Sequence, residues 1–103
     1  MIIIDVETTN DAVKLTTANL SNLGEFISVE HFRNVEKVGY QTIIVGSDHT
    51  LRVDGGLGFG YPGEGPRGLE NILEKLGLDN HKAHSLVYDK NATHFKYEFK
   101  KSI

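Results

Sequence analysis

The chain has no cysteine, so a disulfide framework, a thiolate metal site and a cysteine nucleophile are all excluded. It also lacks an excess of basic residues, because 11 Lys and Arg stand against 14 Asp and Glu. The formal net charge of −3 offers no basic surface to a nucleic-acid duplex, and we expect none as a partner. Long apolar runs are missing as well. Ile2 to Ile4 is followed at once by Asp5, so we expect neither a signal peptide nor a membrane span.

What the chain does contain is the composition of an ordinary folded domain. Apolar residues make up 39% and charged residues 24%, which is too apolar for a disordered chain. The length of 103 residues suits a single domain, residues 1–103, with one modest core. Together with the absence of cysteine, this composition fits a protein of the reducing cytoplasm, which is the compartment we expect.

Glycine and proline are concentrated in one segment, Gly55 to Gly68, with the sequence GGLGFGYPGEGPRG. The segment leads directly into apolar residues at helical spacing: Leu69, Ile72, Leu73 and Leu76. Pro66 suits the first helical position, and Gly77 suits the left-handed residue that ends a helix. The sequence therefore predicts a helix over Pro66–Leu76, with a glycine-rich loop at its N-terminus.

The remaining periodic segments predict strands. They are Ile2–Val6, Ala12–Thr17, Phe26–Phe32, Tyr40–Val45, Thr50–Val53, His84–Tyr88 and Thr93–Lys100. The alternation is clearest in the last, which places Phe95, Tyr97 and Phe99 on one face. No β-α-β alternation is visible. The expected fold class is α+β: an antiparallel β-sheet of about six strands with one main α-helix packed on it.

The glycine-rich loop is the candidate binding site. N–H groups in the first turn of a helix lack intrahelical partners, and bare backbone there can approach an anion. Arg67 can bind a phosphate bidentately, Arg52 could join it, and Phe59 and Tyr61 could stack on a base. The predicted ligand-binding residues are Arg52, Phe59, Gly60, Tyr61, Gly63, Glu64, Gly65, Arg67 and Gly68. In the competing structural interpretation, the glycines only let the chain turn sharply onto the helix.

The segment GFGYPGEGPRGLENIL resembles the GYxGxGPxxLxxxL signature of small proteins encoded by phages, plasmids and bacterial genomes. The resemblance covers about Leu51–Leu76, brings no assigned activity, and rests on Gly60, Tyr61, Gly63, Gly65, Pro66 and Leu69. The chain departs from the usual pattern at Pro62 and Glu64, and the second departure keeps a carboxylate beside any anion. The glycine-rich loop, the helix start and Arg67 predict a small non-enzymatic protein that holds an anionic small molecule. The resemblance to phage-encoded proteins extends this expectation to the sequestration of a host nucleotide signal in an anti-defence role. The protein's partner would be an anionic small molecule of the nucleotide class, held by a monomer or at the interface of a homodimer or higher homo-oligomer.

Two other functions remain open. One is an inhibitor or immunity-type protein that docks an acidic surface on a partner protein. The other follows from IIIDVETT, which resembles the first motif of the DEDD exonucleases and would make Asp5 and Glu7 ligands of two metal ions. His84 and Asp89 match the spacing of the last motif of that family, in which the histidine is the general base. The chain is much shorter than that family's core and has no clear middle Asp motif.

Five histidines, His31, His49, His81, His84 and His94, suggest a metal site at first sight. No cluster of acids accompanies them at ligand spacing, so we expect surface or hydrogen-bonded roles, with no metal and no cofactor.

Overall fold

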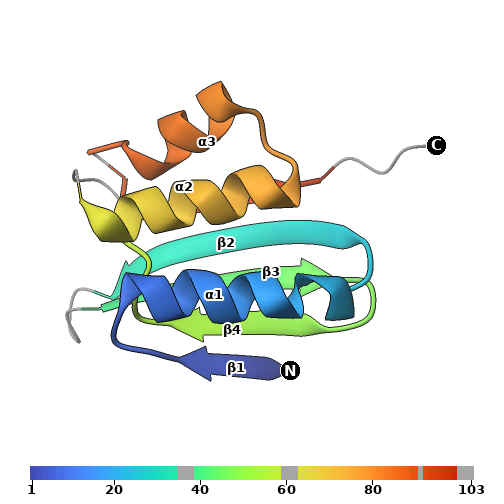
Figure 1. The fold of residues 1–103 in the computed structure, drawn as a ribbon. Helices are drawn as coiled ribbons and strands as arrows, with labels where there is room; N and C mark the ends of the chain where they lie inside the picture. Colours follow the sequence, from blue (N-terminus) through green and yellow to red (C-terminus); the bar gives the residue numbers. More distant parts are fainter. Residues whose placement is uncertain (35–38, 59–62, 91, 100–103) are drawn as a thin grey trace.

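The fold has two layers, a mixed β-sheet and α-helices on one of its faces (Figure 1). The computed structural model describes residues 1–34, 39–58, 63–90 and 92–99. Within these residues the strands are β1 Ile2–Asp5, β2 Phe26–Asn34, β3 Gly39–Gly46, β4 Thr50–Asp54 and β5 His94–Glu98. The helices are α1 Thr9–Asn19, α2 Glu64–Leu76 and α3 Asn80–Val87, with a short 3₁₀ turn at Leu20–Asn22. The α+β class is therefore confirmed.

The sheet is not wholly antiparallel, which corrects the prediction. Its five described strands lie in the order β1-β4-β3-β2-β5, and β1 runs parallel to β4 while the other neighbours are antiparallel. The reason is α1, which carries the chain from β1 back across the sheet, so that β2 runs in the same direction as β1. Two hairpin reversals, into β3 and then β4, restore that direction beside β1. A β-α-β crossover is thus present, contrary to the expectation.

Helix α1 occupies Ala12–Thr17, the segment predicted as a strand, so that prediction is wrong. Thr8 caps the helix, its hydroxyl accepting a hydrogen bond from the Asp11 N–H at 3.2 Å. Ala12 and Thr16 are the buried residues of α1, and they lie four positions apart on one face. The alternation of Val13 and Leu15 misled the prediction because Leu15 is exposed on the helix surface.

The segment His84–Tyr88 was also predicted as a strand, and it lies instead mainly in α3. Asp79 caps this helix by accepting a hydrogen bond from the Lys82 N–H at 2.8 Å. The buried residues are Ala83 and Val87, again four apart. Each of these two helices buries only two residues, one of them alanine, so the apolar pattern gives a weak helix signal. The capping residues Thr8 and Asp79 indicate the two helices more clearly.

Helix α2 confirms the strongest sequence prediction, although it begins at Glu64, two residues before Pro66. It ends as expected: Gly77 has a φ of 112° and donates to the Glu74 carbonyl, while Leu78 donates to the Leu73 carbonyl at 3.1 Å. These two bonds form a Schellman motif.

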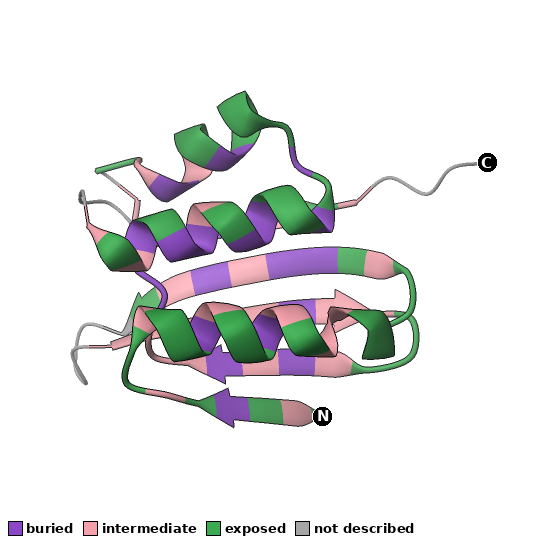
Figure 2. Cartoon of the chain, in the orientation of Figure 1, coloured by how far each residue is buried: buried purple, intermediate pink, exposed green. Residues whose placement is uncertain are grey.

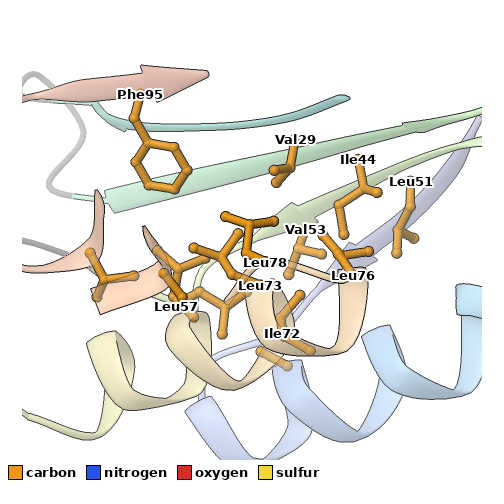
Figure 3. Close-up of a cluster of buried hydrophobic side chains, with 14 of the residues drawn as sticks. Val29, Ile44, Leu51, Val53, Leu57, Ile72, Leu73, Leu76, Leu78 and Phe95 are labelled. Atoms are coloured by element: carbon orange, nitrogen blue, oxygen red, sulfur yellow. The ribbon is translucent and has the colours of Figure 1, made fainter. Parts of the chain in front are cut away.

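The core lies between α2 and the near face of the sheet (Figure 3). The apolar stripe of α2 belongs to one cluster with buried side chains from every described strand: Ile4, Val29, Ile44, Leu51, Val53 and Phe95. Figure 2 shows the buried residues as stripes along the helices and strands, with the exposed residues of α1 and α2 turned outward. Tyr97 and Phe99 are only partly buried, since β5 is an edge strand of the sheet.

The other face of the sheet has no helix over it in the part of the chain that the structure describes. Its side chains alternate with the core residues and are half-buried; they include Gln41, Ile43, Arg52 and Asp54. None of the helices described is long and apolar enough to cross a bilayer.

Candidate functional site

The glycine-rich segment begins with two glycines packed closely against the start of α1 and the residues before it. Gly55 and Gly56 have φ values of 86° and 76°, which side chains other than glycine rarely adopt. A Cβ on Gly55 would strike the Val6 carbonyl oxygen, and one on Gly56 would lie 2.6 Å from the Ala12 Cβ. The Thr9 hydroxyl also donates to the Gly56 carbonyl at 2.6 Å. For these two glycines the structural interpretation is therefore sufficient.

Phe59, Gly60 and Tyr61, the predicted stacking residues and their neighbour, lie outside the described residues. Gly63 precedes α2 and supplies no side chain to cap it. Because Pro66 has no N–H, the N–H groups of Glu64 and Gly65 are the donors in this first turn that lack an intrahelical partner. The helix start thus lies within the glycine-rich segment, two residues earlier than the sequence predicts.

Gly68 brings α1 and α2 into close contact. A Cβ at this position would lie 2.5 Å from the Thr9 Cγ2 and 3.0 Å from the Val13 Cγ2. The two helices lie side by side and begin at the same end of the molecule (Figure 1). The positive ends of their dipoles therefore point to the same region of solvent.

A cleft of about 350 Å³ lies between the first turns of these helices. Three predicted ligand-binding residues line it: Glu64, Arg67 and Gly68. Four further lining residues were not predicted: Thr9, Asn10, Val13 and Asn71. The capping pattern of Thr8 and Asp11 would have placed a helix start here, since it marks the beginning of α1.

The polar groups of the cleft are largely unengaged. Arg67 is exposed and forms no ion pair or side-chain hydrogen bond with the rest of the described chain. The amides of Asn10 and Asn71 are exposed too, and likewise have no side-chain partner within those ranges. Glu64 places a carboxylate at the same cleft. The site thus combines a guanidinium, two amides and two helix starts with one negative charge.

No protein-family model, curated protein or solved structure matches this chain. The function must therefore be argued from the site itself.

Arg52 does not join Arg67. It lies on the uncovered face of the sheet, where its guanidinium binds the Asp54 carboxylate at 3.0 Å. The second oxygen of Asp54 accepts a hydrogen bond from the Gln41 amide at 2.8 Å. Arg52 lines a separate pocket of about 410 Å³ at the ends of β1 and β4.

The residues expected for a nuclease are not brought together. Strand β1 ends at Asp5, so Glu7 is not on the same strand face as predicted. His84 lies on α3 and contacts Glu70 of α2 at 3.0 Å, whereas Asp5 lines the pocket on the sheet. Over the described ranges, no group of three histidine, aspartate or glutamate side chains is placed to hold a metal ion.

Three of the histidines have hydrogen-bond partners. His84 contacts Glu70, His94 contacts Glu30 at 2.6 Å, and the His31 Nδ1 lies 2.7 Å from the Thr42 hydroxyl. His31 is fully buried, and its burial lowers its pKa from 6.5 to about 3. It stacks against Tyr40 and Phe95, which makes it a neutral part of the core.

Proposed function

We propose that the cleft between the first turns of α1 and α2 binds an anionic small molecule of the nucleotide class. The observation that carries this proposal is the position of Arg67, which stands without an ionic partner in the described chain at a cleft where two helices begin. A guanidinium can form two parallel hydrogen bonds to a phosphate, and the two helix dipoles favour the same charge.

The other lining groups favour a nucleotide over a bare phosphate. The carboxylate of Glu64 opposes an anion, but it can accept hydrogen bonds from a ribose hydroxyl or an exocyclic amine. The amides of Asn10 and Asn71 can both donate and accept, as hydrogen bonds to a base edge require. A volume of about 350 Å³ lies within the range of small-ligand pockets.

The proposed role is to hold the ligand without converting it. In the described lining the hydroxyl is that of Thr9, and it donates to the Gly56 carbonyl, whereas a nucleophile in covalent catalysis is hydrogen-bonded to a general base. Sequestration of a nucleotide in the cytoplasm agrees with the resemblance of the loop to phage-encoded proteins.

A thermal-shift screen followed by calorimetry tests the proposal. The panel is inorganic phosphate, AMP, cyclic AMP, ATP and a cyclic dinucleotide, each with and without Mg²⁺. A ligand that binds the native state raises the melting temperature by mass action, and we expect at least one nucleotide to do so. Arg67→Ala should weaken that binding by roughly 10- to 100-fold, the value of a charged hydrogen bond.

Arg33→Ala is the matched control, because it removes the same charge from an exposed arginine on β2 outside the cleft. It should leave nucleotide binding intact. If no nucleotide shifts the melting temperature, or if both arginine variants bind equally well, the proposal is wrong and docking to a protein partner becomes the better hypothesis.

A further inference from the structure

A second pocket lies on the uncovered face of the sheet and has its own polar network. Because β1 and β4 are parallel, their carboxyl ends meet, and Asp5 is paired in register with Asp54. Gln41 of β3 is paired with Asp54 from the other side. The pocket formed here has a volume of about 410 Å³. It is distinct from the cleft between the helices, since none of the residues lining it lines that cleft.

Both carboxylate oxygens of Asp54 are hydrogen-bonded within this network. One of its carboxylate oxygens accepts from Gln41 at 2.8 Å and the other from Arg52 at 3.0 Å. Two donors therefore fix its position, and Asp54 in turn holds the guanidinium of Arg52 at the wall of the pocket. Asp54 acts as a positioning residue for Arg52.

The Arg52 guanidinium has more hydrogen-bond donors than it has acceptors in the described chain. A guanidinium has five N–H donors, and the bond to Asp54 is the hydrogen bond that its side chain makes within the described chain. Its Nε is buried without an acceptor in those ranges. The Arg52 side chain as a whole is 34% exposed, so its remaining terminal N–H donors can reach an acceptor oxygen supplied by a ligand.

Asp5 is a hydrogen-bond acceptor in the same pocket. Its side chain is exposed and makes no hydrogen bond or ion pair within the ranges described. It lies directly across from Asp54, and like charges at paired positions of a sheet repel each other. In the described lining Arg52 already pairs with Asp54, so Asp5 is a carboxylate that an ammonium group of a ligand could pair with.

We propose that this pocket binds a free α-amino acid. The ammonium group would pair with Asp5 and the carboxylate with Arg52, which provides each unmatched group with a partner of the right charge. Phe32 lines the same pocket and gives the ligand side chain an aromatic wall, since it alternates with the buried His31 and so faces the uncovered side of the sheet. This assignment is independent of the nucleotide cleft, because it uses other residues on the other side of the sheet.

Calorimetry with glycine, leucine, phenylalanine and arginine tests the inference, with two chemical controls for the best ligand. The N-acetyl derivative removes the ammonium charge, and the amide removes the carboxylate. We expect the free amino acid to bind, and each derivative to bind at least roughly tenfold more weakly, as for the loss of one charged hydrogen bond. Equal binding of the N-acetyl form overturns the role of Asp5, and equal binding of the amide overturns that of Arg52.

The variant Asp5→Asn should weaken binding by roughly tenfold or more, as the N-acetyl derivative does, whereas Asp48→Asn, which removes the same charge from an exposed turn, should not weaken it. Arg52→Lys keeps the charge beside Asp54 but loses the planar fork, so it should also weaken binding. Circular dichroism confirms that each variant is folded. Arg67→Ala should leave amino-acid binding unchanged, which separates this result from the nucleotide proposal. No binding by any of the four amino acids overturns the inference.

Discussion

At the scale of single residues, Glu64 makes the most discriminating prediction for the cleft between α1 and α2. Its carboxylate repels a phosphate but can accept a hydrogen bond from a sugar or a base. Glu64→Gln should therefore strengthen binding of inorganic phosphate by roughly two- to fivefold, the value of an exposed charge pair. The same change should not strengthen binding of a nucleotide, since it weakens an acceptor. Calorimetry with both ligands measures the difference.

Glu74→Gln is the control for this experiment, because it removes the same charge from the distal half of α2, away from the cleft. It should change neither affinity. If Glu64→Gln raises both affinities by the same factor, the carboxylate does not contact the nucleotide beyond its phosphate.

His31 links the buried core to pH. The folded protein keeps its imidazole neutral, because burial lowers the pKa from 6.5 to about 3. Below pH 6.5 the unfolded chain takes up a proton that the folded chain does not. Stability from this group is therefore complete above pH 6.5, and it falls by up to about 1.4 kcal/mol per pH unit as the pH decreases towards 3.

Urea unfolding at pH 7, 6 and 5 measures this effect. His31→Gln should be less stable at pH 7 but should lose less stability on acidification than the unmodified protein. His49→Gln, at an exposed turn, should retain the original pH dependence. Identical slopes for all three proteins would show that His31 is not the group that titrates.

At the scale of elements, α2 should contribute most to stability through its buried stripe. Leu73 is fully buried against the sheet (Figure 3). Its neighbour Glu74 is exposed. Leu73→Ala should lower the free energy of unfolding by about 2–5 kcal/mol, and Glu74→Ala by far less. Denaturant unfolding of the two variants is the measurement. Small and equal effects would mean that α2 is not docked on the sheet.

The contact between α1 and α2 gives a second prediction at this scale. Gly68→Ala introduces a methyl group that would lie 2.5 Å from the Thr9 Cγ2, so either the Thr9 side chain must rotate or the helices must separate. We expect a loss of about 1–3 kcal/mol, as for other overpacked sites. Thr9→Ser removes that methyl group and keeps the hydroxyl that bonds to Gly56. The double variant Gly68→Ala with Thr9→Ser should therefore recover part of the lost free energy of unfolding. No recovery in the double variant would place the strain elsewhere, for example at Val13.

The elements also show what could be predicted from the sequence. Helix α2 was predicted because four apolar residues have helical spacing and Gly77 ends them, two signals that agree. Helices α1 and α3 were missed because each buries only two residues, including the small Ala12 and Ala83. Half of the cleft was missed with α1, since Asn10 and Thr9 belong to its first turn.

At the scale of the whole molecule, the missed helix also concealed the topology. Once Ala12–Thr17 is taken as a strand, every connection looks like a hairpin and the sheet must be antiparallel. With α1 in place, β1 and β2 run in the same direction, and the chain reaches β4 parallel to β1. The prediction that Arg52 and Arg67 form one site was also wrong. The sequence does not show that Arg52 lies on the face of the sheet opposite to the helices, and the two arginines line separate pockets.

The register of β1 leads to a prediction about the order of folding. Strands β2, β3 and β4 are joined by hairpins and can pair locally, whereas Ile2 must find Leu51. Because closing a long loop costs entropy before any contact rewards it, β1 should dock late. Pulsed hydrogen exchange during refolding should therefore protect the amides of Ile44 and Val53 before that of Ile4. Simultaneous protection would contradict this order.

The parallel pairing of β1 with β4 also leaves β1 without a partner during synthesis on the ribosome, an exposure that equilibrium unfolding does not measure. Strand β1 is made first, and among the described strands β4 is its only partner. Its β-branched run, Ile2 to Ile4, must therefore wait unpaired until Asp54 has left the exit tunnel. During that interval the nascent chain carries an apolar strand edge available to other chains. Asp5, which follows the run at once, is well placed to discourage such pairing.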